Sequence, residues 1–298
     1  MGCHSFALTH QFNQEEFMRR MTLILLFSLL AASPTYAQTS RSAGSYFDRA
    51  MQSFAQGNLD AAINDFDVAI AFDSKHFAAY SNRGIARQRK GDTDGAIQDF
   101  NKAIELSPRC AEAYNNRGVA RRAKGDVEGA LADYNKAIEI TPRFARALYN
   151  RANIRLDRGD LDGAIRDYTA AIKSDPLLIE AHNNRGEARY QRGDIDGAID
   201  DYNEAIRLNP RAAFSYNGRG NARLVKGDLN GAMSDYCKAI EIDPQFAEAY
   251  ANRGLVLLNI GRASEAERDF EQSVRLEPRL KAFLDARINK LKREIADR

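Results

Sequence analysis

The sequence has few of the residues from which catalytic and metal sites are usually built. Its 298 residues include four histidines and three cysteines, and no histidines have the spacing of metal ligands. No serine or cysteine has a histidine and an acid placed to activate it as a nucleophile. The GRG stretch at 218–220 lies inside an expected helix rather than after a strand, so it is not a phosphate-binding loop. We therefore predict a protein that is not an enzyme and uses neither a cofactor nor a metal ion.

An excess of one charge is also absent. The 43 basic and 41 acidic residues give a formal net charge of +2. A nucleic-acid-binding protein would carry a one-sided basic surface. Nucleic acid is therefore not an expected partner.

Long apolar runs are scarce, and the one at 21–32 (MTLILLFSLLAA) stands out. It is too short to span a bilayer comfortably. Arg19 and Arg20 precede it, and Pro34 and the sequence TYAQ follow it. A basic segment, a short apolar run and small residues before a cut are typical of a secretory signal peptide.

We therefore expect residues 1–37 to be an N-terminal extension and signal peptide, cut after Ala37 and followed by a short linker at 38–42. Translation begins either at the first residue or at Met18. An uncleaved anchor is the alternative to cleavage. With cleavage, the mature protein would be bacterial and periplasmic or secreted, and it would not be attached to a membrane.

Proline is scarce, but its placement reveals internal order. Six of the seven prolines recur at one constant interval: 108, 142, 176, 210, 244 and 278. With Ala43 as position 1, seven units of equal length follow without a gap: 43–76, 77–110, 111–144, 145–178, 179–212, 213–246 and 247–280. Position 15 is always glycine, position 20 always alanine, and position 24 always phenylalanine or tyrosine.

This pattern resembles the tetratricopeptide repeat, a helix–turn–helix unit of about 34 residues. The resemblance covers 43–280 and implies an all-α, right-handed α-solenoid, in which each repeat covers the apolar face of its neighbour. Residues 281–298 are expected to form a final capping helix. Its apolar face would carry five side chains: Phe283, Leu284, Ile288, Leu291 and Ile295.

Arginine and aspartate recur at two positions on the packed side of the expected helices. Position 7 is arginine in every unit, where the family usually has leucine, and position 23 is aspartate in every unit. A half-buried guanidinium needs a carboxylate, which it can hold through two parallel hydrogen bonds. We predict that each pair joins the two helices of one repeat. A second arginine row, at position 11, either shares these aspartates or extends to solvent: Arg87, Arg121, Arg155, Arg189 and Arg223.

Asparagine recurs on the face that lines the concave groove in this family. The residues at position 6 are Asn82, Asn116, Asn150, Asn184 and Asn252; those at position 5 are Asn115, Asn183 and Asn217; those at position 9 are Asn153 and Asn221. An amide matches the donors and acceptor of a peptide bond, and asparagine is disfavoured inside helices. We expect the position-6 amides to point inward, largely without intramolecular partners. The alternative is that they cap or solvate an exposed face.

The resemblance implies a non-catalytic scaffold or adaptor that binds an extended peptide or a partner protein in this groove. The asparagines resemble the asparagine ladder of tetratricopeptide O-linked N-acetylglucosamine transferases, although this chain has no room for their catalytic domain. Groove positions 2, 5 and 9 carry no lysine, so the two-carboxylate clamp of some family members is not expected. The alternative function is a structural assembly factor of an envelope complex, which would dock through its convex surface or helix edges.

Overall fold

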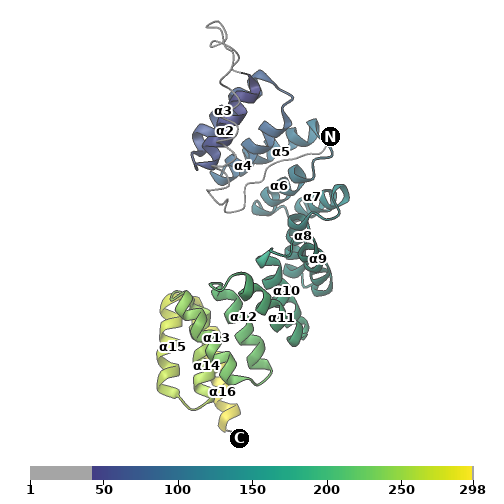
Figure 1. Cartoon of the computed structure of the whole chain (residues 1–298). Helices are drawn as coiled ribbons and strands as arrows, with labels where there is room; N and C mark the ends of the chain where they lie inside the picture. The colour runs from purple at the N-terminus through teal and green to yellow at the C-terminus, as the bar shows by residue number, and fades with distance from the viewer. Residues whose placement is uncertain (1–41, 297–298) are drawn as a thin grey trace, which may run out of the picture. The chain divides into compact units, whose positions relative to one another are not determined.

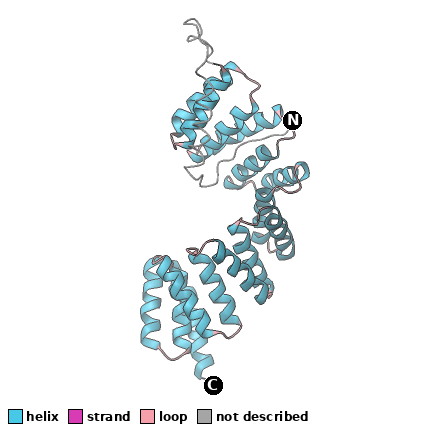
Figure 2. Ribbon diagram, in the orientation of Figure 1, coloured by secondary structure: helices cyan, strands magenta, loops and turns pink. Residues whose placement is uncertain are grey.

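The computed structural model describes residues 42–296, so the expected signal peptide lies outside the described residues. This part of the chain is all-helical, with fifteen α-helices, one 3-10 turn and no strand (Figures 1 and 2). The all-α fold class is therefore confirmed. The chain divides into two compact units, and the boundary lies between Pro142 and Arg143 in the sequence.

The helices come in pairs that recur once in every repeat, and we call the first helix of each pair the A helix and the second the B helix. Unit 1 contains α2 (Ala43–Ala55), α3 (Leu59–Phe72), α4 (Phe77–Arg89), α5 (Thr93–Leu106), α6 (Ala111–Ala123) and α7 (Val127–Ile140). Unit 2 contains α8 (Ala145–Asp157), α9 (Leu161–Ser174), α10 (Ile179–Arg192), α11 (Ile195–Leu208), α12 (Ala213–Val225), α13 (Leu229–Ile242), α14 (Ala247–Asn259), α15 (Ala263–Leu276), the 3-10 turn Pro278–Leu280 and α16 (Lys281–Ala296).

The turn within each pair is built by glycine and aspartate. The position-15 glycines adopt φ values of 75–87°, a left-handed conformation that ends the A helix without a steric penalty. In five repeats the next residue is an aspartate whose Oδ1 accepts from the N–H of a glycine three residues later, as Asp92 does from Gly95 at 2.9 Å. A Cβ on Gly95 would lie 2.2 Å from that carboxylate. Glycine at this place therefore accompanies the aspartate cap.

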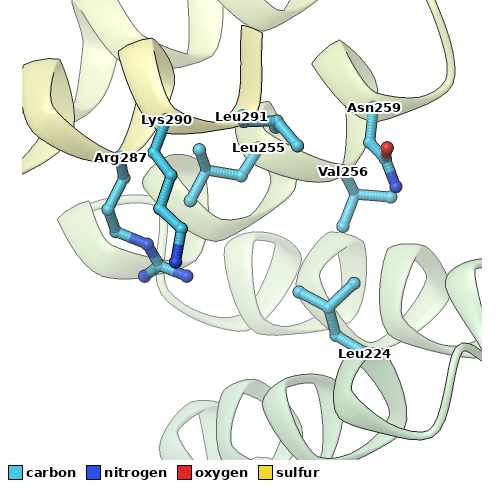
Figure 3. A pocket seen from close by; sticks show the side chains of 7 residues that line it. All are labelled: Leu224, Leu255, Val256, Asn259, Arg287, Lys290 and Leu291. Atoms are coloured by element: carbon cyan, nitrogen blue, oxygen red, sulfur yellow. The ribbon is translucent and has the colours of Figure 1, made fainter. Parts of the chain in front are cut away.

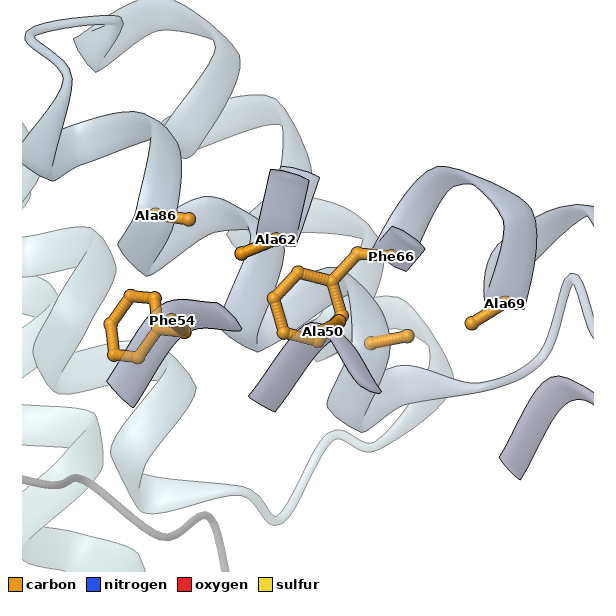
Figure 4. Packing of buried hydrophobic residues seen from close by; sticks show 7 residues of the cluster. Ala50, Phe54, Ala62, Phe66, Ala69 and Ala86 are labelled. Carbon is orange, nitrogen blue, oxygen red and sulfur yellow. The ribbon is translucent and has the colours of Figure 1, made fainter. Parts of the chain in front are cut away.

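Successive repeats pack through small residues of the A helix against the preceding B helix. In unit 1, Ala79 and Ala86 of α4 join a buried cluster with Ala62, Phe66 and Ala69 of α3 (Figure 4). Ala79 and Ala86 occupy positions 3 and 10 of their repeat, and small side chains at these positions let the helices approach closely. The same junction recurs in unit 2, where position 10 packs on positions 20 and 24 of the preceding repeat.

The last helix, α16, packs beside α14 and the 3-10 turn. Leu284 is buried, at 1% exposed, whereas Phe283 is 56% exposed and lies under the Arg287 guanidinium at 5.4 Å. The expectation that Phe283 belongs to the packed face is therefore wrong, because adjacent helical residues point about 100° apart. The side chain of Ile295 lies outside the described residues. No helix in the described part of the chain is long and apolar enough to cross a membrane.

Candidate functional site

The predicted arginine–aspartate pairs are present in all seven repeats. Each position-7 guanidinium donates through Nε and Nη2 to the position-23 carboxylate, with Nε 2.6–3.1 Å from the carboxylate. Arg151 and Asp167, in α8 and α9, are joined by two bonds of 2.8 Å. The aspartates are only 2–8% exposed. The pairs are Arg49–Asp65, Arg83–Asp99, Arg117–Asp133, Arg151–Asp167, Arg185–Asp201, Arg219–Asp235 and Arg253–Asp269.

The second arginine row shares these aspartates, which settles the alternative that the sequence left open. Position-11 arginines donate from Nη1 to the same carboxylates at 2.7–2.9 Å. Their Nε atoms also lie 3.6–3.9 Å from the aspartate that caps the following helix. One buried carboxylate is therefore shared by two guanidinium groups in each of these repeats, and the capping aspartate supplies the second negative charge.

The first arginine row also joins neighbouring repeats. Its remaining nitrogen, Nη1, reaches position 25 of the preceding repeat. The acceptors include Asp67, Asn101, Thr169, Asn203 and, at 3.6 Å, the Cys237 sulfur. The guanidinium groups of this row thus join the two helices of one repeat and also contact the preceding repeat.

The position-9 asparagines satisfy buried tyrosines. The Tyr168 hydroxyl donates to Asn153 Oδ1 at 2.6 Å, and the Tyr236 hydroxyl donates to Asn221 Oδ1 at 2.8 Å. Burial raises the pKa of Tyr236, so this hydroxyl remains a proton donor. Sequence reasoning missed this role, although the signal was visible: repeats with phenylalanine at position 24 carry an apolar residue at position 9 (Met51, Ile85 and Leu255).

The position-6 asparagines are not free, and the expectation that they largely lack intramolecular partners is wrong, because each of the five has one. Asn82 is 4% exposed and donates to the carbonyl of Ala78 at 2.9 Å. Asn184 donates to Asn153 at 2.9 Å, and Asn252 donates to Asn217 at 3.0 Å. Successive A helices lie close enough in unit 2 for these side chains to meet, which the angles on a single helix do not reveal.

The other predicted amides are also partly engaged. Asn116 Oδ1 accepts from Asn115 Nδ2 at 3.3 Å, and Asn150 has a partner as well. Asn183 Oδ1 accepts from the Ser215 hydroxyl at 2.7 Å. In unit 2 the contacts of Asn183, Asn184 and Asn252 fix each amide while leaving one of its polar groups for a ligand. We call the side of the A helices that carries positions 5, 6 and 9 in each unit the A face.

A pocket of about 200 Å³ lies at the end of unit 2, between α12, α14 and α16 (Figure 3). Its apolar lining comes from Leu224, Leu255, Val256 and Leu291. In Figure 3 the side chains of Arg287 and Lys290 lie next to each other along one side, and Asn259 lies on another. The pocket could therefore accept an apolar side chain below a cationic rim.

Comparisons with known proteins agree with this architecture. A family model described as a tetratricopeptide repeat matches 47–108, 81–143 and 149–213, and two further repeat models match 220–261 and 247–280. A search of curated proteins gives no match.

Several solved structures are similar to this chain. The structure of MamA is 28% identical, with a TM-score of 0.50 over 55% of this chain and 96% of its own. A tetratricopeptide repeat protein from Parabacteroides merdae is 21% identical, with a TM-score of 0.61 over 85% and 100% of the two chains. YrrB, a repeat protein with an unusual peptide-binding site, is 21% identical, with a TM-score of 0.53 over 62% and 95%. The matched models extend over more than half of the sequence, and the chain therefore belongs to the tetratricopeptide repeat family.

Proposed function

We propose that this protein is a non-catalytic scaffold that holds an extended segment of a partner protein on its A face. Its family and its structural relatives indicate a protein–protein interaction scaffold. Amides on successive A helices of unit 2 hydrogen-bond to one another, Asn184 to Asn153 and Asn252 to Asn217. These contacts are the observation on which binding at the A face rests.

These contacts orient the amides before a ligand arrives. Asn184 and Asn252 each use Nδ2, which leaves Oδ1 as an acceptor, whereas Asn217 uses Oδ1 and keeps its donor. A peptide backbone offers both kinds of group. Each added hydrogen bond stabilises the complex by about 0.5–1.5 kcal/mol, and less ordering entropy is lost because the amides are already held.

The pocket beside α16 supplies selectivity for side chains. Amides bind a backbone irrespective of its sequence, whereas the apolar lining at Leu224, Leu255 and Leu291 favours an apolar side chain at one place along the segment. The peptide-binding site of YrrB gives a precedent in a protein of the same fold. The expected signal peptide directs the search for the partner to the cell envelope or the medium.

A triple substitution tests this function. Mature protein would capture its partner from an envelope extract, and the purified partner would be titrated against wild type and against a variant with Asn184→Ala, Asn217→Ala and Asn252→Ala. Asn217 and Asn252 are removed together, so neither is left as an orphaned partner. We expect binding to be nearly abolished and the thermal midpoint to stay close to wild type, since alanine favours a helix. Asn230→Ala, an exposed amide on α13, is the matched control.

Full affinity in the triple variant would refute the proposal. The chain would then act as an assembly factor that docks through other surfaces, such as its convex side or its helix edges.

A further inference from the structure

The final B helix, α15, lacks the kind of cover that the other B helices of unit 2 receive. In that unit α9, α11 and α13 are each packed against the A helix that follows them. Beside α15 lies instead a cleft of about 890 Å³, bounded on its other side by α16. Its apolar lining includes Ala266, Phe270 and Val274 of α15. Phe270 keeps partial exposure, whereas the six rings at the same repeat position are 0–1% exposed: Phe66, Phe100, Tyr134, Tyr168, Tyr202 and Tyr236.

Side-chain size explains why α16 does not close this cleft. Lys281 begins α16 one repeat length after the first residue of α14, which places Phe283 and Lys290 at positions 3 and 10. The covering A helices within each unit, α4, α6, α10, α12 and α14, carry alanine or serine at position 3, and alanine or valine at position 10. A phenyl ring and a lysine are too large for the close approach that these positions require.

The cleft also contains a hydrogen-bond acceptor at position 25. In earlier repeats the side chain at this position accepts from an arginine of the next A helix, but here no arginine within 42–296 donates to it. Glu271 occupies position 25, where the preceding repeats offer a side chain to the guanidinium of the next A helix. Glu271 lines the cleft, is exposed, and has no ion pair among the described residues. The α13–α14 junction shows the two contacts that α15 lacks. There Val256, at position 10, packs on the ring of Tyr236, and the Arg253 guanidinium reaches the position-25 side chain of Cys237.

We infer that this cleft is a docking site for one α-helix of a partner protein. The helix carries alanine or serine, an arginine four residues later, and alanine or a β-branched apolar residue three residues after that. The small residues pack on Phe270 and Val274, and the arginine pairs with Glu271. A second copy of the chain is a poorer match, because its first A helix, α2, carries Ser45 and Arg49 but places Gln52 at the third site. This surface is separate from the A face.

The test uses a labelled peptide that copies α6, AEAYNNRGVARRA, with a hydrocarbon link between the positions of Asn115 and Val119. That link keeps the short peptide helical on the side away from Ala113, Arg117 and Ala120. Fluorescence anisotropy should show saturable binding to the mature protein. Glu271→Arg should weaken it by about fivefold or more, which corresponds to about 1 kcal/mol.

Three controls make the result specific. A peptide with Arg117→Glu should regain affinity for the Glu271→Arg protein, and one with Ala113→Trp should not bind. Glu248→Arg, an exposed glutamate of α14 outside the cleft, should leave affinity unchanged. The A-face triple variant should bind this peptide as wild type does, so failure here and failure of the proposed function are distinguishable.

Absence of saturable binding, or equal affinity for wild type and Glu271→Arg, would overturn the inference. Sedimentation velocity would show whether the chain dimerises through this cleft. A dimer of the chain that the peptide dissociates would make the occupant a second copy and would overturn its assignment to a partner protein.

Discussion

Removal of one arginine from a buried pair should cost stability, and the structure sets the size of the loss. In Arg151→Leu, Asp167 keeps a single cationic partner, Arg155 at 2.9 Å, while remaining 5% exposed. Loss of one partner from a fully buried pair costs about 3–5 kcal/mol. Because Arg155 remains, we expect a smaller cost of about 1–3 kcal/mol. Asp167→Asn should cost more, since it removes the carboxylate that two half-buried guanidinium groups share and leaves Arg155 with only Asp160, 3.8 Å from its Nε.

Denaturant unfolding of the mature protein, followed by far-ultraviolet circular dichroism, would measure these changes. The double variant Arg151→Leu with Asp167→Asn should be more stable than the sum of the single losses predicts, by about 1 kcal/mol or more. The matched control is Asp162→Asn, which removes an exposed pair with Arg192 and should stay close to wild type. Strict additivity of the two buried substitutions, with unchanged denaturant slopes, would refute the reasoning.

Three further outcomes are expected. N-terminal sequencing of exported protein should begin at Gln38, and recovery of residues 1–17 on a soluble cytosolic protein would contradict the signal-peptide prediction. Burial raises the pKa of Tyr134 to about 12; its neutral form is favoured in the folded state, so its contribution to stability is complete below about pH 10 and is lost between about pH 10 and 12. Ultraviolet difference absorbance should show this late ionisation, and titration at the ordinary tyrosine pKa would contradict it. Finally, Asn153→Val should destabilise the protein by removing the Oδ1 that accepts the hydrogen bond of the Tyr168 hydroxyl, and Tyr168→Phe added to it should recover part of the thermal midpoint; no recovery would show that the hydrogen bond is irrelevant.

Features that depend on one repeat alone could be predicted from the sequence. The all-α fold follows from columns with local causes, such as a glycine that ends one helix and an aspartate that starts the next. The pairing of Arg151 with Asp167 was also predictable. A half-buried guanidinium at position 7 needs a carboxylate, and position 23 carries an aspartate in every repeat.

Features that depend on contact between repeats were not predicted. Helical angles indicate the direction of Asn184, but not that the neighbouring A helix brings Asn153 within 2.9 Å. Within one repeat, the sharing of Asp167 by Arg155 was one of two alternatives that the sequence left open, because it depends on side-chain reach rather than on direction. The open cleft beside α15 depends on the size of Phe283 and Lys290. The sequence shows that these residues occupy positions 3 and 10, but only the packed structure shows that they are too large to let α16 cover α15.

The recurring junction between repeats has a consequence for how such a chain changes length. Every A helix that covers a B helix brings the same three side-chain types to it, and nearly every B helix offers the same alanine, ring and acceptor in return. Loss of residues 179–212 would bring Ser215, Arg219 and Ala222 to the surface that now receives the removed repeat. A duplication or deletion of one whole repeat would therefore recreate the same helix–helix contacts at the new junction.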